Sequence, residues 1–73
     1  MTSTVKVLIF GKDTCPYTLM AREDYTTNNI PFDYINVKAS DENMQQMLKY
    51  SKGSRKVPVI VEGEKVKIGY GGT

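Results

Sequence analysis

A short apolar segment near the N-terminus constrains the fold more than any other feature. Val5 and the unbroken run from Val7 to Phe10 are β-branched or large apolar residues, and Gly11 follows them. A run of this length that ends at a turn residue is typical of a strand buried on both faces of its sheet. We therefore predict a central strand over 5–10, in a fold that supplies cover on both sides.

Two amphipathic helices are predicted to supply that cover. The first begins at 14–16, because proline suits the first helical turn, and reaches about Asn28. The second begins after Ser40, a plausible N-cap, and ends before Gly53. The apolar positions at helical spacing are Tyr17, Met20, Ala21 and Tyr25 in the first helix and Met44, Met47 and Leu48 in the second.

Three further β segments complete the pattern, at 32–37, 57–61 and 66–68. The turn at 62–64 is so short that the last two must form an antiparallel hairpin. The helical connections predict that strands 5–10, 32–37 and 57–61 run parallel to one another. The expected fold class is α/β, with the order β-α-β-α-β-β and a four-stranded mixed sheet, in a single domain over 1–73.

The composition excludes several kinds of active site. The 73 residues contain no histidine and one cysteine, Cys15, so the chain alone cannot form a Ser/His/Asp triad, a Cys/His pair or a thiolate and imidazole zinc cluster. It cannot form an internal disulfide either, which favours a reducing compartment. A net charge of +2 does not indicate nucleic acid binding. With no membrane-length apolar run and no signal-peptide pattern, we expect a cytoplasmic protein without membrane contact.

Cys15 is the residue with the most distinctive position. It lies where a strand-to-helix loop meets the start of a helix, so unsatisfied N–H groups and the positive end of the helix dipole favour its thiolate. Lys12, three residues earlier, adds a nearby cation. An arbitrary lone cysteine is more often a small buried apolar residue, but the helix start that leaves a parallel sheet is where α/β folds place ligands.

The surrounding residues resemble the glutaredoxin family. The segment from Lys12 to Thr18 is similar to the active-site loop of glutaredoxins, Cys-Pro-Tyr-Cys after a lysine, with Thr18 in place of the second cysteine. The segment 55–59 resembles the family's Thr-Val-Pro segment, with Lys56 in place of the threonine, and 68–70 resembles its glycine turn. The resemblance implies a thioredoxin-like fold and a cis Val57–Pro58 bond, whereas the residues alone favour the commoner trans bond.

Two features of the family pattern are missing. The acidic residues that usually follow the glycine turn are absent, and so is the C-terminal helix. We therefore expect one face of the sheet to be under-covered. The chain corresponds to a monothiol, Cys-Pro-Tyr-Thr variant of the family.

The resemblance implies a role for several positions. Cys15 would be the nucleophile that reduces protein–glutathione mixed disulfides, with glutathione as co-substrate and no metal. Arg55 and Lys56 would form ion pairs with the carboxylates of glutathione. The residues implied to bind glutathione are Lys12, Tyr17, Thr18, Lys56, Val57, Pro58, Gly69 and Tyr70.

The expected partners are glutathione and proteins with glutathionylated or disulfide-bonded cysteines. We expect the chain to be a monomer and to bind no nucleic acid. Two alternatives remain open. Some single-cysteine glutaredoxins bridge an iron–sulfur cluster between two chains. Pro16 and Tyr17 stiffen and crowd the loop after Cys15, which favours catalysis over cluster binding. The chain could also be a redox partner of a reductase or peroxidase, and Cys15 could stand where a relative has selenocysteine.

Overall fold

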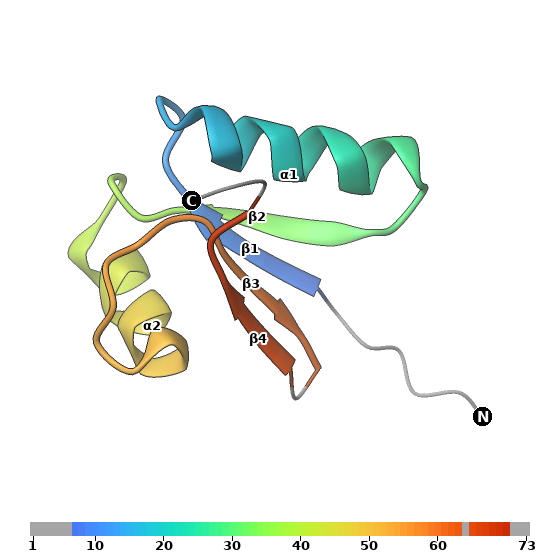
Figure 1. Cartoon of the computed structure of the whole chain (residues 1–73). Helices are drawn as coiled ribbons and strands as arrows, with labels where there is room; N and C mark the ends of the chain where they lie inside the picture. The colour runs from blue at the N-terminus through green and yellow to red at the C-terminus, as the bar shows by residue number, and fades with distance from the viewer. Residues whose placement is uncertain (1–6, 64, 71–73) are drawn as a thin grey trace.

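The computed structural model describes residues 7–63 and 65–70, which form two helices and four strands in the predicted order (Figure 1). The elements are β1 (Val7–Gly11), α1 (Pro16–Thr27), β2 (Phe32–Asn36), α2 (Asp41–Ser51), β3 (Val59–Glu62) and β4 (Lys65–Ile68). The sheet is mixed and its strand order is β2-β1-β3-β4. The α/β fold class and the hairpin of β3 and β4 are therefore confirmed. Val5 of the predicted first strand and Glu64 of the predicted turn lie outside the described residues.

The prediction that the third strand runs parallel to the first two is wrong. β1 and β2 are parallel, but β3 is antiparallel to β1, with Val59 opposite Phe10. The cause is the connection over 52–58, which runs back along the molecule after α2 has ended, so that β3 starts where β1 ends (Figure 1). An extended segment of that length spans about 20 Å, enough to pass a short strand. The path of this connection, and not the helix, decides the direction of β3.

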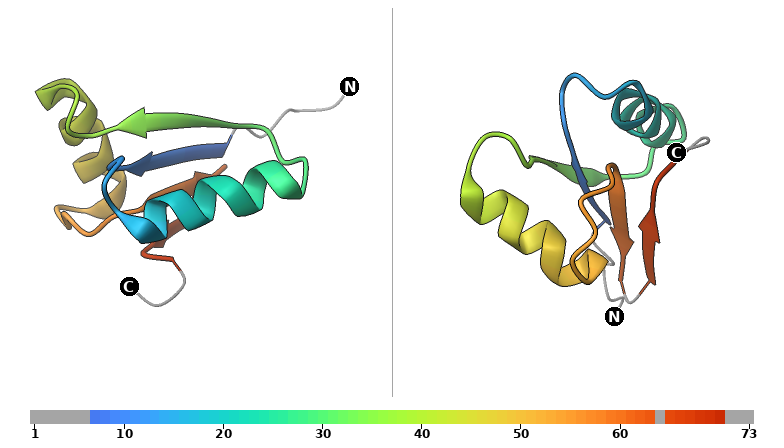
Figure 2. Two further views of the ribbon diagram at one scale, coloured as in Figure 1. Left: turned by 90° about the horizontal axis from the view of Figure 1, so that it is seen from above. Right: turned by 60° about the vertical axis from the view of Figure 1, so that its left-hand side comes forward.

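The sheet lies between the two helices, as the right-hand view of Figure 2 shows. Side chains alternate along β1, so Val7 and Ile9 pack with α1 while Leu8 and Phe10 pack on the side of α2. Ile9 and Phe10 are fully buried, and burial of each such side chain contributes about 1.5–3 kcal/mol. The expectation that the first strand needs cover on both faces is confirmed.

Helix α1 buries part of the face that was predicted: Ala21 and Tyr25 are in the core, as expected, but Met20 is not. Thr18, Ala21 and Tyr25 are its buried residues, and Met20 is 44% exposed. Met20 follows Thr18 by two positions, so it points about 200° away around the helix. The prediction was wrong for Met20 because a polar residue, Thr18, occupies the core position instead. The helix ends as expected, with Asn29 in the left-handed region at a φ of +58°.

Helix α2 follows its predicted signals. The Ser40 hydroxyl accepts a hydrogen bond from the N–H of Asn43 at 3.2 Å and so caps the helix. Met47 is fully buried in the core on this side of the sheet, with Met44 and Leu48 packed around it. Lys52 closes the helix at a φ of +58°, and its N–H donates to the carbonyl of Leu48.

Strand β4 forms one edge of the sheet, and all of its residues are exposed. No third helix occurs among the described residues, and 71–73, where the sequence ends, lie outside them. Neither α1 nor α2 has the length and apolar character needed to cross a lipid bilayer.

Candidate functional site

Cys15 is the N-cap residue of α1 and follows the end of β1, one of the two inner strands of the sheet, by four residues. Its N–H donates to the carbonyl of Lys12 at 3.1 Å, and its own carbonyl accepts from the N–H of Leu19 at 3.1 Å. The side chain is partly buried and packs against the core on the α2 side, which includes Val57. Backbone hydrogen bonds therefore fix the backbone of Cys15 at the start of α1, with its side chain only partly buried.

The surroundings of Cys15 favour its thiolate. Partial burial alone would raise the pKa of the thiol, but hydrogen bonds from the Thr18 hydroxyl and from the N–H groups of Thr18 and Tyr17 outweigh that effect. The nearby Lys12 ammonium acts in the same direction. The pKa of Cys15 is lowered as a result, in the direction expected for a reactive cysteine.

Thr18 has a larger role at the site than its place in the family pattern suggests. It is fully buried, and its Oγ1 accepts a hydrogen bond from the N–H of Lys12 at 3.5 Å. A Cβ on Gly11 would lie 2.4 Å from the Thr18 Cγ2 and 2.5 Å from its Oγ1. The glycine thus leaves the space that lets the Thr18 hydroxyl reach both Lys12 and the Cys15 sulfur. In the sequence, the signal for this contact was a glycine at the end of the first strand with a threonine seven residues later.

The segment before β3 forms the other side of the site. The Val57–Pro58 bond is cis, as predicted. Val57 is buried in the same cluster that Cys15 contacts, and Pro58 accepts a hydrogen bond from the N–H of Gly69 at 2.7 Å. The structure therefore brings Val57 to the cluster that Cys15 contacts, and a hydrogen bond joins the neighbouring Pro58 to Gly69.

Two further residues implied to bind glutathione are Lys56 and Tyr70. The side chain of Lys56 is exposed. The Tyr70 hydroxyl donates to Asp24 Oδ2 at 2.6 Å, and Asp24 lies about 13 Å along α1 from Cys15. Tyr70 packs with the core on the α1 side, so its hydroxyl is directed away from the sulfur. Its assignment to the glutathione site stays a prediction.

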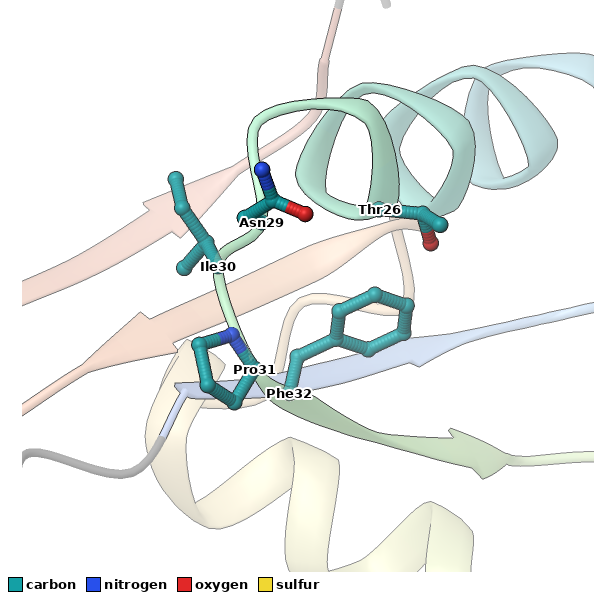
Figure 3. A pocket seen from close by; sticks show the side chains of 5 residues that line it. All are labelled: Thr26, Asn29, Ile30, Pro31 and Phe32. Atoms are coloured by element: carbon teal, nitrogen blue, oxygen red, sulfur yellow. The ribbon is translucent and has the colours of Figure 1, made fainter.

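A surface hollow away from Cys15 shows no comparable chemistry. It lies at the far end of α1 and is lined by Thr26, Asn29, Ile30, Pro31 and Phe32 (Figure 3). It has no nucleophile and no ionisable side chain. Among the described residues, no group of three or more histidine, cysteine, aspartate or glutamate side chains is placed to hold a metal ion.

The chain is similar to glutaredoxins in both sequence and structure. A glutaredoxin family model matches residues 7–66. The glutaredoxin grx-1 from Archaeoglobus fulgidus is 30% identical, over 92% of this chain and 77% of its own, with a TM-score of 0.77. Glutaredoxin 1 from Francisella tularensis, solved with cacodylate, is 24% identical over 90% of this chain and 84% of its own, with a TM-score of 0.70.

A third similar structure is the glutaredoxin-like NrdH-redoxin from Escherichia coli. It is 20% identical over 88% of this chain and 82% of its own, with a TM-score of 0.76, and it shares the fold. No curated protein gives a significant match to the sequence.

Proposed function

Because the chain belongs to the glutaredoxin family and is a thiol-disulfide oxidoreductase, we propose that it reduces protein–glutathione mixed disulfides by a monothiol route. The observation that carries the proposal is the position of Cys15 as the N-cap of α1, where the Thr18 hydroxyl and backbone N–H groups lower the pKa of its thiol. Thiolate, not thiol, is the attacking species in disulfide exchange. The chain has no second cysteine, so the route passes through an external thiol.

The proposed reaction has two steps. In the first, the Cys15 thiolate attacks the glutathione sulfur of the mixed disulfide, and the target cysteine leaves as a thiolate. In the second, the thiolate of another glutathione attacks the sulfur of the glutathione bound to Cys15, which releases oxidised glutathione and regenerates the Cys15 thiolate. In sum, one mixed disulfide and one free glutathione give one protein thiol and one oxidised glutathione. Because Cys15 is modified in the first step and restored in the second, the kinetics should be ping-pong.

The arrangement around Cys15 supports glutathione as the co-substrate. Among the described residues, neither the N–H nor the carbonyl of Val57 takes part in a hydrogen bond, so this backbone is available to a peptide added as a strand. Lys12 lies on one side of the sulfur, and the exposed Arg55 and Lys56 lie in the segment that leads to Val57. Glutathione is an anionic tripeptide, and these cations suit its carboxylates.

The proposal is tested by mass spectrometry after incubation with oxidised glutathione. We expect one glutathione adduct per chain, located on Cys15 by peptide mapping, and none on a Cys15→Ser variant. Cystine and hydroxyethyl disulfide serve as comparison disulfides. Equal reaction with all three would show that the cysteine is reactive but that Lys12, Val57 and Gly69 do not form a glutathione site.

A further inference from the structure

A cluster of four polar side chains stands beside Cys15 and has no part in the exchange reaction. The Asp13 carboxylate accepts hydrogen bonds from the Tyr34 hydroxyl at 2.7 Å and from the Asn36 side-chain amide at 3.2 Å. Arg22 Nη1 lies 3.8 Å from the same carboxylate, and the Arg22 guanidinium stacks 3.9 Å from the centre of the Tyr34 ring. The cluster joins the loop before α1 to α1 itself and to β2.

The loop that Asp13 belongs to sets the surroundings of the sulfur. Lys12, the residue before it, donates its N–H to the Thr18 hydroxyl and accepts the N–H of Cys15 at its carbonyl. Tyr34 and Asn36 belong to β2, which is paired along its length with β1. Asp13 lies two residues before Cys15 and therefore links the short loop before α1 to β2.

The charges of the cluster suit this position. A free carboxylate near Cys15 would oppose formation of the thiolate, but Arg22 and the two hydrogen-bond donors offset the negative charge of Asp13. Burial, together with the hydrogen bond to Asp13, raises the pKa of Tyr34 to about 12. The Tyr34 hydroxyl thus stays protonated, and so remains a donor, across the pH range in which thiols react.

We propose that Asp13 is a positioning residue, which acts through Tyr34 and Asn36 to hold the loop so that Lys12 and the Thr18 hydroxyl stay at the Cys15 sulfur. The inference deepens the proposed function, since it concerns the same cysteine. Its test measures the reactivity of Cys15 toward iodoacetamide, a reaction that needs no glutathione.

The main variant is Tyr34→Phe, which removes one hydrogen bond to Asp13 and leaves every charge in place. Tyr25→Phe is a matched control, because Tyr25 also donates to a carboxylate at 2.7 Å, that of Glu62, but on the far side of the fold from Cys15. We expect Tyr34→Phe to slow alkylation below the thiol pKa at least about threefold and to move the pH midpoint upward. Tyr25→Phe should lower thermal stability without changing either quantity.

Asp13→Ala and the double variant Asp13→Ala/Tyr34→Phe show whether Tyr34 acts through Asp13. If it does, Tyr34→Phe has no further effect on alkylation once Asp13 is gone. The proposal is overturned if Tyr34→Phe changes stability alone, as Tyr25→Phe does, or if the two effects on alkylation simply add. A wild-type chain that is alkylated rapidly but forms no glutathione adduct would refute the proposed function and leave the positioning role standing.

Discussion

The replacement Thr18→Val tests the source of the Cys15 thiolate most directly. Valine has nearly the shape of threonine, so the contact with Gly11 is retained while the hydroxyl is lost. A hydrogen bond to a charged group contributes about 1.5–3 kcal/mol. Because Cys15 is only partly buried, we take the lower end, about 1.5 kcal/mol. Since about 1.4 kcal/mol corresponds to a factor of ten, the population of thiolate below the pKa should fall about tenfold.

The assay is the rate of Cys15 alkylation by iodoacetamide as a function of pH, with thermal unfolding recorded in parallel. Thr26→Val is a suitable control, because the Thr26 hydroxyl donates to the Arg22 carbonyl within the same helix and is exposed. We expect the pH midpoint to rise in Thr18→Val and to stay unchanged in Thr26→Val. If Thr18→Val keeps the wild-type midpoint, the helix N–H groups and Lys12 suffice to stabilise the thiolate, and the role assigned to the hydroxyl is wrong.

Three further outcomes are expected. Gly11→Ala places a methyl group against Thr18 and should cost about 1–3 kcal/mol of stability in urea unfolding and slow the alkylation of Cys15; a stable, fully reactive variant would contradict this packing. Thr18→Cys, one helical turn from Cys15, should form an intramolecular disulfide under mild oxidation, detected as a mass loss, and failure to form it would argue against the active-site assignment. The hydrogen bond from Tyr25 lowers the pKa of Glu62, so Glu62 contributes stability above its unfolded pKa that is lost as the pH falls through the folded value. The Glu62→Gln variant should therefore lose less stability than the wild type between about pH 6 and pH 3 in urea unfolding. An equal loss in both proteins would refute this pH dependence.

Local signals predicted the individual elements well. The apolar run Val7–Phe10 gave a buried strand, Ser40 capped the second helix, and the turn after Glu62 gave an antiparallel hairpin. Each of these depends on residues close together in the sequence. The family resemblance added the cis bond before Pro58, which the residues alone did not favour.

Long-range geometry was beyond the sequence pattern. The direction of β3 depends on the path of 52–58, which no local preference encodes. The burial of Thr18 depends on the bare backbone of Gly11, and hydropathy alone placed Met20 in the core instead. The contacts of Asp13 with Tyr34 and Asn36 join residues more than twenty positions apart, so they become visible only once β2 is placed beside the loop.

The place of β1 between β2 and β3 also bears on how the protein matures during synthesis. β1 can pair with β2 early, but its other neighbour lies about 50 residues later in the chain, and contacts at such separations form slowly. Until residues 59–62 leave the ribosome, one edge of an apolar strand stays unpaired and open to aggregation. Val57, which packs in the cluster around Cys15, arrives with the same late segment. The surroundings of Cys15 are thus completed only after residues 57–62 have been synthesised.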